Sequence, residues 1–70
     1  MFILTQDSMA IFEITRFDYI AVTEEGRVVA GDAQINYFLG EYESIDRAKE
    51  VVEEIFSMIG SVQKYDMPVI

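Results

Sequence analysis

The side chains best suited to chemistry in this sequence are carboxylates in its C-terminal half. Five of them recur at helical spacing in the segment 41–56, so we expect them on one side of a helix. An acidic stripe of this kind favours contact with a basic partner, because complementary charge steers association and fixes its register. The alternative is a helix face that simply lies in water. The acidic residues are Glu43, Asp46, Glu50, Glu53 and Glu54.

A second set, of arginines and tyrosines, indicates a site for a nucleotide-like anion. Arg47 falls in the first turns of the expected helix, where exposed main-chain amides also attract anions. Guanidinium groups bind phosphate with paired hydrogen bonds, and Tyr42 or Tyr37 is expected to stack on the base of such a ligand. The alternative is that Arg47 pairs locally with Glu43 or Glu50. The complete set is Arg16, Arg27, Arg47, Tyr37 and Tyr42.

The residue types that are missing exclude several kinds of chemistry. The chain has no cysteine and no histidine, which rules out disulfides, cysteine-based metal sites and the commonest general base. No serine therefore has a histidine to activate it, and no glycine-rich phosphate loop occurs. The carboxylates do not follow the alternating spacing of a calcium-binding loop. We therefore expect no enzymatic activity, no metal site and no cofactor.

The composition indicates one small acidic domain over residues 1–70. Hydrophobic residues make up 51% of the chain, which is enough for a packed core. The formal net charge is −8 and the few lysines and arginines are scattered, so direct nucleic-acid binding is not expected. The apolar N-terminal stretch lacks a positive region before it and is interrupted by Asp7 and Glu13, unlike a signal peptide or a membrane span. These features predict a cytoplasmic protein without membrane association.

The first half of the chain alternates short β-favouring segments with turn residues. Turn signals recur every 8–12 residues or so, which is the spacing of an antiparallel meander. Gly26 is expected to adopt a positive φ in a tight hairpin. The expected strands, about five in number, are 2–5, 9–15, 19–24, 27–30 and 35–39.

The pattern changes to a helical period after residue 44. Apolar residues at i, i+3 and i+4 spacing predict one buried helix face over residues 44–59. Ser44 is a suitable N-cap, and Gly60 is suited to end the helix. The tail 60–70 is expected to be irregular, because Pro68 restricts any final strand to an edge. The fold predicted is therefore α+β, a small antiparallel β-meander with one C-terminal helix packed across one face.

One helix covers only one face of a sheet, yet large apolar residues occur on both faces of the expected strands. Strand alternation leaves Met9, Ile11 and Phe38 on the uncovered side. Exposed apolar patches usually mark an interface, so these residues predict a homo-oligomer or an obligate partner. The alternative is a tail that folds back over this face. Its apolar residues are Tyr65, Met67, Val69 and Ile70.

Three segments of the chain resemble a family of short phage and prophage proteins of Firmicutes. The matching features are the "TQDS" turn near the start, "FLGEYESIDRAKEVVEEI" and the late "MP" of Met67 and Pro68. That family typically has a "QD" turn between strands, an "LG-x-Y" segment before a helix with an "RA-x-E" run, and a closing "MP". The resemblance implies an α+β fold and a phage or prophage origin. It transfers no catalytic or binding residue.

These observations predict a non-enzymatic binding protein that antagonises or modulates a host factor, such as a defence system, in the host cytoplasm. In the first form of this hypothesis the acidic helix face contacts a host protein. In the second, the protein is an oligomeric sponge whose arginines and tyrosines bind a nucleotide-like anionic signal. A third alternative is a small structural or assembly protein. Fold alone does not choose among them.

Overall fold

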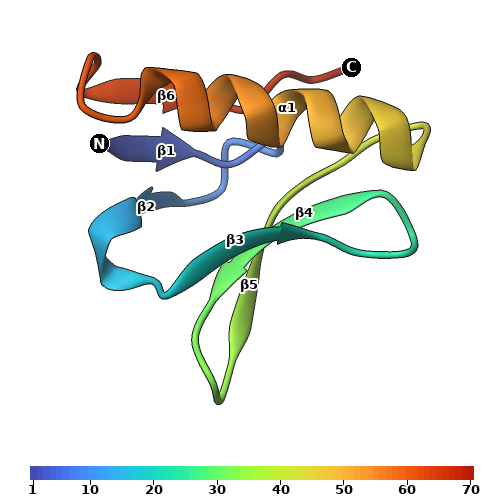
Figure 1. The fold of residues 1–70 in the computed structure, drawn as a ribbon, viewed down its shortest axis with the longest axis horizontal. Coiled ribbons are helices and arrows are strands. Elements are labelled where there is room, and N and C mark those ends of the chain that lie inside the picture. Colours follow the sequence, from blue (N-terminus) through green and yellow to red (C-terminus); the bar gives the residue numbers. More distant parts are fainter.

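The computed structural model describes residues 1–70 and contains six strands, one α-helix and one short 3-10 helix (Figure 1). The predicted α+β class, with a C-terminal helix packed on antiparallel strands, is confirmed. The elements in chain order are β1 (Phe2–Leu4), β2 (Ile11–Glu13), η1 (Ile14–Arg16), β3 (Tyr19–Val22), β4 (Arg27–Gly31), β5 (Asn36–Glu41), α1 (Ile45–Met58) and β6 (Lys64–Asp66).

The strands are divided between two three-stranded sheets instead of forming one continuous meander. The first sheet has the order β2-β1-β6 and the second has the order β3-β4-β5. The strand expected over 9–15 ends at Glu13, because the next three residues form the 3-10 turn η1. The Glu13 carboxylate caps this turn by accepting from the Thr15 main-chain N–H at 3.2 Å. The turn redirects the chain from the first sheet into the second.

The tail contains a strand, so the expectation that residues 60–70 are irregular is wrong for its middle part. β6 pairs in parallel with β1, with Ile3 opposite Tyr65. Tyr65 and Met67 are buried while Lys64 and Asp66 are exposed, which is the alternation of a strand with one covered face. β6 is an edge strand, as Pro68 required.

Helix α1 begins and ends close to the predicted residues. Ser44 Oγ accepts a hydrogen bond from the Arg47 main-chain N–H at 3.0 Å and so caps the N-terminus. Gly60, with a φ of +85°, follows the last turn. The predicted apolar face is buried only along its centre, at Ala48, Val51 and Ile55.

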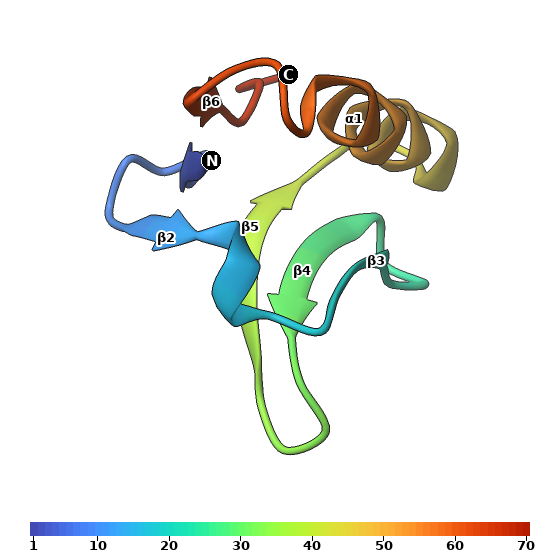
Figure 2. The ribbon, with the colours of Figure 1, turned by 60° about the vertical axis from the view of Figure 1, so that its left-hand side comes forward.

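A single hydrophobic core lies between α1 and the two sheets (Figure 2). Ile3 of β1, Leu39 of β5 and Ile55 of α1 are each only 1% exposed. A smaller aromatic cluster also joins the sheets, because the rings of Phe12 and Phe17 lie 5.3 and 5.7 Å from the Tyr37 ring. The hairpin between β4 and β5 extends away from the helix in both views (Figures 1 and 2).

A bulge in β5 connects the two sheets through Gln6. The register places Val28 opposite Gly40 and Val29 opposite Phe38, so Leu39 is the extra residue in β5. Its main-chain carbonyl accepts from the Gln6 main-chain N–H at 2.8 Å. The Gln6 amide also donates to the carbonyls of Glu41, Pro68 and Val69 at 3.0 to 3.2 Å. One side chain therefore ties the β1–β2 turn to β5 and to the tail.

Candidate protein-interaction surfaces

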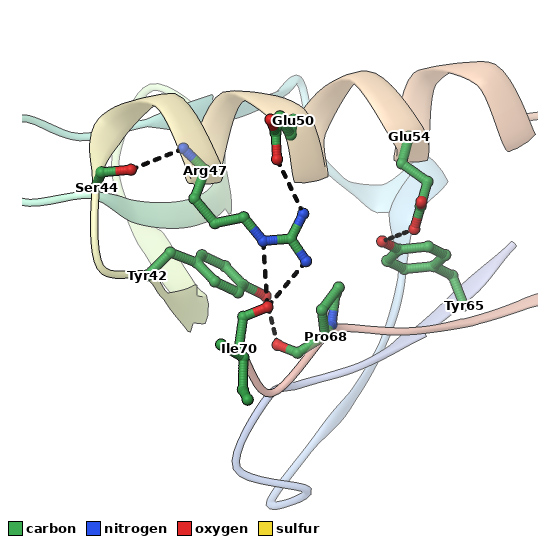
Figure 3. Close-up of polar contacts among 8 residues, drawn as sticks. All are labelled: Tyr42, Ser44, Arg47, Glu50, Glu54, Tyr65, Pro68 and Ile70. Carbon is green, nitrogen blue, oxygen red and sulfur yellow. Dashed lines mark hydrogen bonds and ion pairs between the residues drawn. The ribbon is translucent and has the colours of Figure 1, made fainter.

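The predicted acidic stripe lies on the outside of α1, and two of its five carboxylates are engaged within the chain. Glu50 forms an ion pair with Arg47 at 3.2 Å, and Glu54 accepts a hydrogen bond from the Tyr65 hydroxyl at 2.6 Å (Figure 3). The remaining three side chains are exposed and make no hydrogen bond or ion pair: Glu43, Asp46 and Glu53. The acidic helix face therefore consists of three free carboxylates rather than five.

Arg47 holds the tail instead of standing open to an anion. Its Nε and Nη2 atoms donate to the main-chain carbonyl oxygen of Ile70 at 3.1 and 2.8 Å (Figure 3). Its guanidinium carbon lies 5.8 Å from the centre of the Tyr42 ring, within the range of a cation–π contact. Tyr42 is buried and its hydroxyl donates to the Pro68 carbonyl at 2.8 Å. Both residues thus fasten the tail to the start of α1.

The other members of the predicted anion site lie apart from one another. Arg27 begins β4 and pairs with Glu41 of β5 at 3.4 Å. Tyr37 faces Ala30, near the opposite end of β4, and its ring contacts Phe12 and Phe17. Arg16 ends η1 beside Phe17. The structure therefore does not bring the three arginines together around one ligand-sized space.

The Tyr65–Glu54 contact makes stability sensitive to alkaline pH. Burial, followed by the hydrogen bond to Glu54, raises the pKa of Tyr65 above its ordinary value of 10. The folded chain therefore keeps this phenol neutral where the unfolded chain ionises it, so stability is present below pH 10 and falls as the pH rises above it. Tyr65→Phe should cost about 1 kcal/mol at pH 7 and make the loss of stability above pH 10 shallower.

Urea unfolding at pH 7 and pH 10.5 measures this effect. Tyr37→Phe is the matched control, since the Tyr37 hydroxyl forms no hydrogen bond in the chain and the residue is 40% exposed. An equally steep alkaline loss in Tyr65→Phe and in the unsubstituted chain would contradict the assignment.

The three residues predicted to form one oligomer face do not share one surface. Met9, at 82% exposure, lies in the turn before β2, and Ile11, at 67% exposure, lies on the outer face of the first sheet, whereas Phe38 is on the second sheet. The tail does fold back, but only Tyr65 and Met67 enter the core. Val69 and Ile70 remain exposed. The alternative in which the tail folds back over Met9, Ile11 and Phe38 is therefore wrong, because these three residues are exposed as well.

The outer face of the first sheet carries a shallow apolar depression of about 440 Å³. Phe2, Leu4 and Ile11 form its floor, and they share one face because the side chains of the opposed pair Ile3 and Phe12 point to the other face, toward the core. Lys64 and Asp66 border it on the β6 side. We call this surface the first-sheet face.

The outer face of the second sheet is exposed at Phe38 and Tyr19, whereas Val29 at its centre is buried. Phe38 lies opposite Val29, and Val29 lies opposite Ala21, so the three side chains form one apolar row across the sheet. Tyr19 extends the same face, because it lies two residues before Ala21 along β3. We call this surface the second-sheet face.

A third apolar surface is a groove between α1 and β3, with a volume of about 300 Å³. Tyr19 and Ile20 line it from β3, and Val52, Phe56 and Ile59 line it from α1. We call it the helix–β3 groove. The groove was not predicted from the sequence, because the apolar face over residues 44–59, which includes Val52 and Ile59, was expected to be buried. The signal for it was Phe56, a large apolar residue next to that stripe and 78% exposed.

Six of the exposed large apolar side chains thus lie on three surfaces, while five of the ten residues predicted to bind a partner or an anion pair within the chain. No group of three or more acidic side chains is arranged to hold a metal ion. None of the helices has the length and apolar character that crossing a bilayer requires. The chain matches no known protein family, no curated protein and no solved structure.

Proposed function

We propose that the protein is a non-enzymatic binding protein that acts by direct contact with another protein. The observation that carries this proposal is the large number of apolar side chains that are exposed rather than buried. Thirteen large hydrophobic residues are exposed, whereas eleven hydrophobic residues are buried. Contiguous exposed apolar patches mark interaction sites, because burying them gains about 25 cal/mol per Å² of apolar surface.

The resemblance to phage and prophage proteins supports a host protein as the partner, which this protein would antagonise or modulate by binding. The free carboxylates of the acidic helix face lie outside the apolar surfaces and would steer a basic partner toward them. Association with further copies of the chain through the first-sheet face or the second-sheet face belongs to the same proposal. The net charge of −8 favours a basic partner protein.

The nucleotide-sponge alternative has less support from the geometry. Arg47 already donates to the Ile70 carbonyl and pairs with Glu50, and Arg27 pairs with Glu41. A phosphate would have to displace these partners. Tyr42, which was expected to stack on a base, is buried.

The test is quantitative affinity capture from a bacterial host extract with one variant for each apolar surface. Ile11→Ser alters the first-sheet face, Phe38→Ser the second-sheet face and Phe56→Ser the helix–β3 groove. Val69→Ser, in the exposed tail, is the control. We expect one stoichiometric protein partner, or a defined oligomer by sedimentation, that one surface variant weakens about tenfold or more while its circular dichroism is unchanged.

Two results would contradict the proposal. One is a chain that sediments as a monomer and captures no stoichiometric partner. The other is a partner whose binding none of the three surface variants weakens, because the exposed apolar residues would then have no part in binding.

A further inference from the structure

The outer edge of β3 has main-chain groups without a strand to pair with. β3 is at the end of its sheet and its residues form main-chain hydrogen bonds with β4 alone. Thr23 N donates to Arg27 O at 2.8 Å, which identifies the hydrogen-bonded positions of the ladder. In an antiparallel pair these positions alternate, so the N–H and C=O groups of Ile20 and Val22 point to the free edge.

The helix–β3 groove lies directly beside this edge. Ile20 forms part of its β3 side, and Phe56 and Val52 of α1 form the facing wall. A strand added to β3 would direct every second side chain toward this wall, because side chains opposite Ile20 and Val22 lie on the same face. Strand addition supplies affinity through main-chain hydrogen bonds and specificity through pockets for alternate side chains.

The charges at the two ends of β3 indicate which kind of strand fits. Asp18 precedes β3 and lines the groove, and Glu24 and Glu25 follow the strand. All three are exposed and form no ion pair. Lysine or arginine at the ends of an incoming strand would therefore face carboxylates, and opposite charges across a strand pair are favourable.

The same charges disfavour a second copy of this chain as the occupant. Antiparallel pairing of two β3 edges in the register that centres on Ala21 would place Asp18 of each copy opposite Glu24 of the other. Like charges directly opposite one another destabilise a strand pair. Charged ends of this kind are a common means by which edge strands avoid pairing with their own copies.

We infer that the helix–β3 groove binds an extended segment of a basic protein, which adds to β3 as an antiparallel strand. Its alternate apolar side chains pack against Val52 and Phe56, and its flanking lysines or arginines face Asp18 and Glu24. This inference rests on the proposed function and names the class of partner and the way in which it binds.

The first experiment uses the blocked peptide Lys-Thr-Val-Thr-Val-Thr-Lys, whose length matches residues 18–24. Its two valines would lie opposite Val22 and Ile20, and its lysines opposite Glu24 and Asp18. We expect amide NMR shifts to localise at β3 and the facing side of α1. We also expect binding about tenfold tighter than that of the same peptide with glutamates in place of lysines.

Backbone methylation tests strand addition without changing the protein. The valine N–H groups of the bound peptide would face β3, so methylating both valine nitrogens should weaken binding about tenfold or more. The threonine N–H groups would point away, so methylating the central threonine nitrogen should leave binding within about twofold. Equal effects of the two modifications would overturn the strand-addition geometry.

Two protein variants test the walls and the charges of the groove. Phe56→Ser should weaken peptide binding about tenfold, whereas Met9→Ser, which removes another exposed apolar side chain, should not. Asp18→Lys should remove most of the preference for the lysine peptide over the glutamate peptide, because one peptide lysine then faces a lysine while the other still faces Glu24. Phe56, Met9 and Asp18 are all exposed, so these substitutions are expected to leave folding unaffected, which circular dichroism checks.

The outcomes separate this inference from the proposed function. If no peptide binds while a stoichiometric partner is still captured by Phe56→Ser, the groove inference fails and protein binding through another surface stands. If the chain sediments as a dimer that Phe56→Ser dissociates, the occupant is a second copy and the basic-segment inference is overturned.

Discussion

Ile3→Ala is expected to leave a large fraction of the protein molecules unfolded at 25 °C. Ile3 is 1% exposed, lies on the central strand of the first sheet and contacts the core shared with α1 and β4. Truncating a buried isoleucine to alanine costs about 2–5 kcal/mol, because the neighbours do not close the cavity. A single core of this size supplies only about 3–5 kcal/mol in total. The substitution therefore removes most of the free energy of unfolding.

Ile11→Ala is the matched control, because Ile11 lies on the neighbouring strand β2 but points to the exposed face. Its effect on the free energy of unfolding should be within about 0.5 kcal/mol at low micromolar protein concentration. Urea titration followed by circular dichroism measures both variants. Equal destabilisation by Ile3→Ala and Ile11→Ala would show that the core is not where the structure places it.

Gly31→Ala is expected to cost about 3 kcal/mol, near the upper end of what overpacking usually costs. A Cβ atom at this position would lie 2.5 Å from the Ile35 carbonyl oxygen and 2.8 Å from Asn36 Cα. These main-chain atoms belong to the β4–β5 turn and to the first residue of β5, and the turn is held in place because Asp32 accepts hydrogen bonds from the Gln34 and Ile35 N–H groups. The strand pairing therefore has to shift to admit a methyl group.

Gly60→Ala distinguishes steric overlap from the general effect of replacing a glycine. Gly60 has a φ of +85°, but a Cβ atom there would meet no other atom within 4 Å. Its substitution should cost only about 1 kcal/mol, from the left-handed backbone conformation. Thermal unfolding of both variants tests the comparison. A Gly31→Ala variant as stable as Gly60→Ala would contradict the tight turn that the structure shows.

Features set by local sequence could be predicted well. Ser44 caps α1, Gly26 adopts a φ of +82°, and the helix covers 45–58 against an expected 44–59. Each depends on residues within one turn of the chain, where side-chain hydrogen bonds and backbone preferences decide the conformation. The alternation that exposes Ile11 and buries part of Phe12 was also correct, because strand geometry alone determines it.

Features set by contacts between distant residues could not be predicted. The pairing of β1 with β6 joins Ile3 to Tyr65 across nearly the whole chain, and no local signal specifies a parallel partner. The division into two sheets follows from the 3-10 turn at residues 14–16, which carry β-favouring residues such as Ile14. Propensity favoured continuing the strand there, and the capping by Glu13 overrode it.

Contacts between residues distant in the sequence also decide the candidate sites, so these could be predicted only in part. Local pairing of Arg47 with Glu50 was one of the two alternatives considered, but its stronger contacts are with Ile70, which folds back from the tail. Glu54 likewise accepts from Tyr65, a residue whose burial depends on β6. The helix–β3 groove requires two elements to lie side by side, so the sequence offered only the unexplained Phe56.

Native mass spectrometry of the protein, purified gently from cells that produce it in a bacterial host, tests the central claim most directly. The account predicts a complex whose mass equals one or more chains plus a stoichiometric protein, or a whole multiple of the chain mass. Phe56→Ser or Ile11→Ser should reduce the fraction of this complex. A bare monomer, or a chain that carries only the added mass of a nucleotide, would contradict a function based on protein contact.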